Sequence, residues 1–183
     1  MSNFLRESLK NLKTVGTITR SSKFLCEHVV RLANLKKARC VVELGAGDGV
    51  LTRYILSDLP PGSKLLAFEI NKNFCSSLRE IHDKRLIIIE DSAERLSYYL
   101  ALYGFAKVDV IISALPFVVF PDAVSGSIVQ SCYDYLEPLG KYVQIQYSLL
   151  TKKLYKNVFG NLNIRFELLN LPPAFVFISQ KRA

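Results

Sequence analysis

A glycine-rich segment, Val41–Val50, carries the clearest chemical signal in the chain. It reads VVELGAGDGV: an apolar run predicted as a buried strand leads directly into Gly45, Gly47 and Gly49. Glycine lets the backbone turn tightly and approach a ligand closely. The helix predicted to begin near Gly49 would direct free N–H groups at an anion such as a carboxylate or phosphate. The segment therefore predicts a ligand-binding loop between a strand and a helix.

Three acidic residues indicate what kind of ligand this loop would hold. The third glycine of the dinucleotide fingerprint GxGxxG is replaced by Val50, and the pattern here is ExGxGxG with Glu43 first. An acid at that place is awkward beside a pyrophosphate but suits a ligand with an ammonium and a sulfonium. Glu69 ends the second predicted strand, where a carboxylate can accept both hydroxyls of a ribose. Asp91 follows the third, where an acceptor can take the exocyclic amine of adenine.

Alternating strands and helices must position these residues. Apolar, β-branched runs predict seven strands, at Cys40–Leu44, Lys64–Ile70, Arg85–Glu90, Val108–Ser113, Lys141–Tyr147, Ile164–Leu169 and Phe175–Ser179. Helices are predicted between most of them, over Gly49–Leu59, Asn71–Ile81, Pro121–Leu136 and Leu149–Val158. A further helix is predicted after the third strand, where Asp91 can act as its cap and Glu94 stands at the capping-box position. Such alternation predicts an α/β, Rossmann-like sheet, mostly parallel, with helices on both faces. The short loop around Pro172 and Pro173 predicts that the last strand is antiparallel.

A second predicted helix precedes the first strand. Ser21 or Ser22 can cap it. Helical spacing predicts that five of its residues face inward, namely Phe24, Leu25, His28, Val29 and Leu32.

The loop and the two later acids together resemble class I S-adenosylmethionine (SAM)-dependent methyltransferases. The resemblance implies that SAM is the cofactor, bound at the edge where doubly wound sheets bind their ligands. It implies that Glu43 and the Gly45–Gly49 loop, Ala46 included, hold the methionine part, and that Glu69 and Ile70 hold the ribose. Asp91, Ser92 and Ala93 would hold the adenine.

The fourth predicted strand ends in Ser113-Ala114-Leu115-Pro116-Phe117. In this superfamily that place faces the methyl acceptor, and the rRNA adenine dimethylases carry Asn-Leu-Pro-Tyr there. Carbonyl and hydroxyl oxygens can accept an amine's hydrogens and so aim its lone pair, with an aromatic ring beside it. The resemblance thus implies acceptor roles for Ser113, Leu115, Pro116 and Phe117, with Ser113 also bordering the cofactor. The alternative is a buried strand exit kinked by proline.

Four further segments are similar to the bacterial phospholipid N-methyltransferases. They are NLKTVGTITRSSKFL (11–25), ISALPFVVFP (112–121), GKYVQIQYS (140–148) and NLPPAFVF (170–177). This resemblance covers nearly the whole chain and implies methylation of phosphatidylethanolamine and its methylated derivatives. The chain has Ala114 where that family usually has glycine and Arg20 where it often has proline. Another aminolipid or a small amine is therefore an alternative acceptor.

Several residues are candidates for contacts with the lipid headgroup. Tyr147 lies at the end of the fifth predicted strand and could hold an ammonium group through its ring or hydroxyl. A tyrosine at the edge of the core is the alternative. Arg20, Lys152 and Lys153 are candidates for phosphate contacts, with ordinary solvated charge as the alternative for the lysines.

The charge distribution points to an anionic partner. Residues 1–40 hold nine basic and two acidic residues, residues 41–140 hold eight and thirteen, and residues 141–183 hold seven and one. Residues 1–15 also read as an amphipathic helix, with Phe4, Leu5, Leu9 and Leu12 on one side and basic residues on another. We expect this helix to dock on an anionic membrane, within an N-terminal segment 1–37 that precedes a methyltransferase domain 38–183. Packing on its own domain is the alternative.

Composition excludes several other classes. Half of the 183 residues are hydrophobic and 22% are charged, so a disordered chain is excluded, and no run of 18 apolar residues exists. Four cysteines without a CxxC pair and two histidines predict reduced thiols and no metal site. We expect a cytoplasmic monomer, peripheral on the inner face of the membrane. An RNA adenine N6-methyltransferase and a non-catalytic SAM-binding module remain the alternatives, so nucleic acid stays open as a partner.

Overall fold

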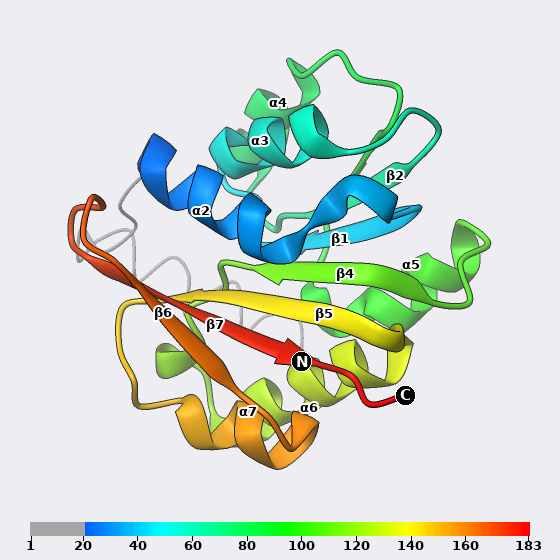
Figure 1. Cartoon of the computed structure of the whole chain (residues 1–183). Helices are drawn as coiled ribbons and strands as arrows, with labels where there is room; N and C mark the ends of the chain where they lie inside the picture. The colour runs from blue at the N-terminus through cyan, green and yellow to red at the C-terminus, as the bar shows by residue number, and fades with distance from the viewer. Residues whose placement is uncertain (1–20) are drawn as a thin grey trace.

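A seven-stranded sheet organises residues 21–183, which are the residues that the computed structural model describes (Figure 1). The strands follow one another along the sheet in the order β3-β2-β1-β4-β5-β7-β6. Only the two pairs that β7 makes are antiparallel. The prediction of a seven-stranded, mostly parallel α/β sheet with an antiparallel last strand is confirmed. In chain order the strands are β1 (Cys40–Leu44), β2 (Lys64–Phe68), β3 (Leu86–Ile89), β4 (Val108–Ser113), β5 (Leu136–Gln146), β6 (Asn163–Glu167) and β7 (Ala174–Gln180).

Helices cover both faces of this sheet (Figure 1). One layer holds α2 (Lys23–Ala33), α3 (Val50–Asp58) and α4 (Lys72–Arg79); the other holds α5 (Leu96–Leu102), α6 (Asp122–Tyr135) and α7 (Lys152–Phe159). All five residues of β1 are buried, and alternate residues face opposite layers: Val41 belongs to the core with Ile55 of α3, and Val42 to the core with Ile128 of α6. Burial on both faces explains why the strands read as continuous apolar runs.

Helix α2 begins one residue after Ser22, as expected. The Ser22 hydroxyl accepts a hydrogen bond from the Leu25 amide at 3.2 Å and caps the helix. The prediction that Phe24 faces inward is wrong, because its side chain is 45% exposed. The buried face is turned by about one position and consists of Leu25, Cys26, Val29, Val30 and Ala33.

The cap after β3 also differs from the prediction. Ser92, not Asp91, is the N-cap of a short 3-10 turn, η2 (Ala93–Arg95), and accepts from the Glu94 amide at 3.2 Å. The carboxylate of Asp91 instead accepts from the Ser92 amide and from the hydroxyl of Tyr99. The predicted capping box of Asp91 and Glu94 is therefore not formed: the cap is Ser92, and Asp91 is bound to Tyr99 of α5.

Strand β5 begins five residues earlier than predicted. Pro138 and Gly140 read as a turn, yet the strand starts directly after α6 because Leu136 pairs with Val108 of β4. The register then shifts before Lys141 pairs with Val110. This irregularity absorbs the turn-forming residues within the strand.

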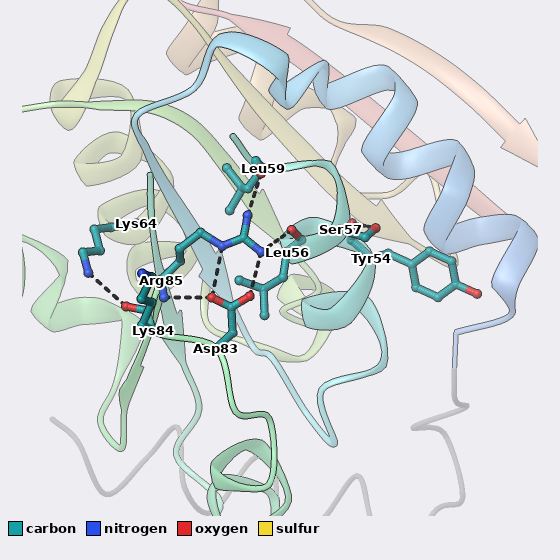
Figure 2. Close-up of polar contacts among 8 residues, drawn as sticks. All are labelled: Tyr54, Leu56, Ser57, Leu59, Lys64, Asp83, Lys84 and Arg85. Carbon is teal, nitrogen blue, oxygen red and sulfur yellow. Dashed lines mark hydrogen bonds and ion pairs between the residues drawn. The ribbon is translucent and has the colours of Figure 1, made fainter. Parts of the chain in front are cut away.

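One arginine ties α3 to the segment before β3 (Figure 2). The guanidinium of Arg85 donates to the carbonyls of Leu56 and Leu59 at 2.8 and 2.6 Å, at the end of α3. It also forms an ion pair with Asp83 at 2.6 Å. Carbonyls in the last turn of a helix lack helical partners, so Arg85 caps the carboxyl end of α3 through its guanidinium. This fixes the far end of the helix that opens at the glycine-rich loop.

Some predictions fall outside the described part of the chain. The amphipathic helix over residues 1–15 and Arg20 both lie there. Residues 21–37 pack on the same sheet as the rest of the chain, through the buried face of α2. Within residues 21–183 no helix is long and apolar enough to cross a membrane. The four cysteines are buried, free thiols.

Candidate active site

The carboxyl ends of four neighbouring strands bring the predicted site segments to one edge of the sheet. Leu44, the last residue of β1, is aligned with Phe68 on one side and with Ser113 on the other. Phe68 is in turn aligned with Ile89 of β3. The glycine-rich loop, Glu69, Asp91 and the segment 113–117 all follow these strand ends. The arrangement places them where doubly wound sheets bind ligands.

The carboxylate of Glu69 joins two of these loops. Its Oε2 accepts from the amide of Gly47 at 2.8 Å, and its Oε1 accepts from the amide of Asn71 at 2.8 Å. The side chain is nearly buried. Each carboxylate oxygen can accept a further hydrogen bond. Glu69 can therefore hold the glycine-rich loop in place and still accept hydroxyl groups of a ligand.

Glu43 lies beneath the loop and is buried. Its Oε2 accepts from the hydroxyl of Thr52 at 2.7 Å, but its buried Oε1 has no hydrogen-bond partner among the described residues. Burial raises the pKa of Glu43 to about 8, the hydrogen bond from Thr52 opposes this, and the charge of Glu69 adds to it. A cation at this place would satisfy the buried oxygen and stabilise the carboxylate.

The glycine-rich loop is closely packed at Gly45 and open at Gly47. Gly45 and Gly47 both have positive φ angles, of 78° and 57°, which other residues rarely adopt. A Cβ atom at Gly45 would lie 3.1 Å from a methyl group of Leu115, whereas one at Gly47 would meet no atom within 4 Å. Gly45 therefore keeps the loop close to residues 113–117, the acceptor segment. The open space lies at Gly47.

Asp91 has several protein partners. It accepts from the Ser92 amide at 2.7 Å and from the Tyr99 hydroxyl at 2.9 Å, and Arg95 lies 3.5 Å away. The side chains of Ser92 and Ala93 are buried. These contacts fix the carboxylate at the end of β3, and Ile70 packs against the core next to it on the β2 side.

The acceptor segment is held from below by a buried glutamine. Gln144 of β5 donates to the carbonyl of Leu115 at 3.0 Å and accepts from the hydroxyl of Tyr142. The Leu115 carbonyl also accepts from the Phe117 amide at 2.9 Å. Ser113 is fully buried, and its hydroxyl accepts from the Leu115 amide at 3.3 Å. In this structure Ser113 thus shapes the segment from within.

The other members of the segment differ in exposure. Phe117 is buried in edge-to-face contact with Phe120 and Tyr155, and Pro116 is half-buried. Ala114 is exposed. When the Asn-Leu-Pro-Tyr motif is aligned on Leu115 and Pro116, Ala114 takes the position of the asparagine. The segment therefore presents no side-chain amide at that position.

Tyr147 lies at the same edge, directly after β5. The residue is 41% exposed. Burial raises the pKa of Tyr147, and the side chain of Asn170 opposes the rise. Tyr147 therefore lies at the edge that carries residues 113–117, because β5 and β4 are parallel neighbours.

Comparison with known families decides what kind of protein this is. A model of the ribosomal RNA adenine dimethylase family matches residues 16–157, which is most of the chain. The chain belongs to this family. It is a SAM-dependent N-methyltransferase. The Oε1 of Glu43, which has no partner within residues 21–183, and the open space at Gly47 fit a bound cofactor with a cationic part.

The relatives of this chain include proteins named as a lipid methyltransferase and as an RNA methyltransferase. The ornithine lipid N-methyltransferase of Singulisphaera acidiphila is 29% identical over 93% of this chain and 91% of its own. The ribosomal RNA small subunit methyltransferase A of Nostoc punctiforme is 24% identical over 91% of this chain and 58% of its own. Precorrin-6y C5,15-methyltransferase of Geobacter metallireducens shares the fold, with a TM-score of 0.72 at 13% identity over 90% and 93% of the two chains.

Sequence reasoning missed the residues that support the site from below. Thr52 and Gln144 are buried polar residues bonded to the predicted site residues Glu43 and Leu115, and the buried Asn170 accepts from the amide of Ser22. A polar residue between apolar ones, such as Gln144 between Val143 and Ile145 in β5, was an available signal. Its partner on another strand could not be identified without the sheet order.

Proposed function

We propose that this N-methyltransferase acts on the amine of a membrane aminolipid headgroup, with phosphatidylethanolamine and its methylated derivatives as substrates. The observation that carries this proposal is the relative named as an ornithine lipid N-methyltransferase, which aligns over nearly the full length of both chains. Both lipids present an amine on a headgroup attached to two acyl chains. The full-length match supports acceptors of that class.

The cofactor roles that we propose follow the geometry of the strand ends. SAM supplies an electrophilic methyl group on a sulfonium. The loop from Gly45 to Gly49 and the carboxylate of Glu43 would hold its methionine part, and Glu69 would accept from the ribose. Asp91 and the Ser92 backbone would hold the adenine, with Ile70 and Ala93 beside it.

The acceptor amine must present its lone pair to the methyl carbon. Oxygen acceptors at the end of β4 can orient the amine's hydrogens, and the exposed ring of Tyr147 can contact a cationic headgroup. Ser113 and Gln144 would act by positioning the segment, because both are fully buried. Leu115, Pro116 and Phe117 would form the wall of this acceptor site.

RNA adenine N6-methylation is the second candidate. The family model and the Nostoc relative favour it. Ala114 weighs against it, since the adenine dimethylase motif carries an asparagine at that position. An exposed methyl group cannot accept the hydrogens of an adenine amine.

We further propose that the enzyme works as a monomer at the inner face of the membrane, in the cytoplasm. The basic residues of both chain ends support attraction to anionic lipid. Arg20, Lys152 and Lys153 would contact headgroup phosphates, and the amphipathic segment 1–15 would add apolar contact.

Transfer of labelled methyl groups tests the acceptor. The purified full chain is given methyl-labelled SAM with vesicles of phosphatidylethanolamine and phosphatidylglycerol, with ornithine lipid vesicles, or with unmodified rRNA. We expect label in the lipid extract and its loss in Glu43→Ala. Label in rRNA alone would replace the lipid proposal by the RNA one, and label in none would refute both.

A further inference from the structure

Large apolar side chains are exposed on three loops that follow β4, β5 and β6. Leu150 and Leu171 are each 81% exposed, and Leu169 is 61% exposed. Isolated exposed leucines are ordinary, but a group on neighbouring loops is characteristic of an interaction surface. The group consists of Val118, Val119, Leu149, Leu150, Leu168, Leu169 and Leu171.

The sheet topology brings these loops to the edge that carries the candidate active site. Strands β5 and β6 both pair antiparallel with β7, so they run in the same direction. Their following loops therefore lie at the same edge as the loop after β4. Figure 1 shows the β6–β7 hairpin reaching this edge, next to the first turn of α2. Exposed Phe24 belongs to that turn.

A buried asparagine holds the tip of this hairpin, residues 168–173, in place. Asn170 accepts from the Ser22 amide at 2.8 Å and donates to the Pro172 carbonyl at 2.7 Å. It is only 3% exposed. The side chain of Asn170 is thus bonded inward, while Leu169 and Leu171 on either side of it are exposed. The tip therefore presents apolar side chains from a segment that a buried polar residue holds in place.

A second contact fixes the base of the tip. The carboxylate of Glu167 accepts from the Leu169 amide at 3.0 Å and pairs with the ring of His28 at 2.9 Å. These bonds link the hairpin to the middle of α2. The tip is therefore attached to the core at both ends.

Basic residues surround the apolar group. Lys23, Lys152 and Lys153 are exposed at the starts of α2 and α7. Exposed acids on the same edge are few: Glu27 of α2 and Asp122 of α6. Apolar side chains flanked by lysines match the boundary between acyl chains and anionic headgroups. An RNA would find the lysines but would leave the leucines without partners.

We propose that the tip of the β6–β7 hairpin inserts into an anionic bilayer. This insertion places the edge of the sheet that carries residues 113–117 against the bilayer. Leu168, Leu169 and Leu171 enter the acyl boundary, Leu149 and Leu150 lie alongside, and the lysines contact anionic headgroups. This inference rests on the proposed lipid substrate, because it explains how a headgroup amine reaches the end of β4. It adds a contact to that expected of residues 1–15.

A single tryptophan tests the insertion directly, because the chain has no tryptophan of its own. Leu169→Trp is mixed with vesicles of phosphatidylethanolamine and phosphatidylglycerol, and its emission is recorded with and without brominated acyl chains. We expect a blue shift and quenching by the bromines. The matched control is Leu102→Trp, whose leucine is 58% exposed at the end of α5. It should show neither change.

Charge at the tip tests whether the contact matters for binding. We expect Leu169→Glu to weaken vesicle binding on the order of tenfold, and Leu102→Glu to leave it unchanged. Unchanged binding in Leu169→Glu, or a blue shift that grows with protein concentration in the absence of vesicles, would overturn the proposal. The second result would identify a copy of the chain as the occupant.

The two proposals can fail separately. If vesicles shift and quench Leu169→Trp but receive no labelled methyl groups, the hairpin contact stands and the lipid substrate does not. If lipid is methylated but the tryptophan is neither shifted nor quenched, the substrate stands and the hairpin contact does not. SAM binding by calorimetry confirms that each variant is folded.

Discussion

Burial changes the acid–base chemistry of Glu43. A carboxyl with a pKa of about 8 is mostly protonated at neutral pH, and its Oε1 has no partner among the described residues. Folding therefore favours the protonated form. The contribution of Glu43 to stability is full below the unfolded pKa of 4.5, falls as pH rises through the interval to about 8, and is constant above it.

Binding of a cation beside Glu43 should reverse this preference and release a proton. We expect SAM to bind more tightly as pH rises from about 6 to about 8, by up to tenfold per pH unit. Calorimetry in buffers of different ionisation enthalpy measures the proton released. The physical reason is that the charged cofactor stabilises the carboxylate that burial disfavours.

Glu43→Gln provides the control, because it keeps the shape of the side chain and removes the titration. The α-amino group of SAM titrates in the same range and should still contribute in this variant. The difference between the two proteins therefore belongs to Glu43. Identical proton release in both would show that the cofactor does not contact this carboxyl.

At the scale of elements, the local signals of the sequence and the tertiary structure agree in some places and differ in others. The glycine-rich loop and the acids at the ends of β2 and β3 were predictable, because each follows an apolar run within a few residues. The start of β5 was not, because pairing of Leu136 with Val108 overrides the turn signal of Pro138 and Gly140. The buried supports Thr52 and Gln144 act across elements, and no local pattern identifies their partners.

Arg85 also joins elements that are distant in sequence, and its loss should destabilise the fold. We expect Arg85→Leu to lower the free energy of unfolding by about 1–3 kcal/mol, since two helix-end carbonyls and Asp83 lose their partner. Denaturant unfolding measures the change. The matched control is Arg79→Leu, which breaks an ion pair whose arginine is 55% exposed and should have a much smaller effect, because solvent screens that pair. Equal effects would contradict the capping role.

The ion pair of Arg85 and Asp83 predicts that the stability of the fold decreases at low pH. Hydrogen bonds from Arg85 lower the pKa of Asp83 to about 2 from its ordinary 3.8. A lowered carboxyl pKa stabilises the fold above the unfolded value, and this contribution is lost as pH falls through about 2. Asp83→Asn should therefore unfold with a shallower pH dependence below about pH 4 than the unaltered protein. A parallel pH dependence would mean that the pair does not persist in solution.

At the scale of the whole molecule, the basic residues are divided between two edges of the sheet. Lys152 and Lys153 follow the carboxyl end of β5, whereas Lys36 and Lys37 precede the amino end of β1. All four are exposed. If net charge alone attracts the enzyme to a membrane, the two pairs are equivalent. If the carboxyl edge faces the bilayer, only the first pair lies within a Debye length of anionic headgroups, about 8 Å at physiological salt.

Charge reversal of each pair separates these cases. Each lysine close to an anionic surface contributes about 1 kcal/mol, and reversal adds repulsion. We therefore expect Lys152→Glu/Lys153→Glu to weaken binding to phosphatidylglycerol vesicles at least about tenfold, with an effect that shrinks as salt is raised. Lys36→Glu/Lys37→Glu carries the same change in net charge and should bind almost as the unaltered protein does. Cosedimentation over a salt series compares them, and equal losses would mean that the molecule is attracted without a preferred face.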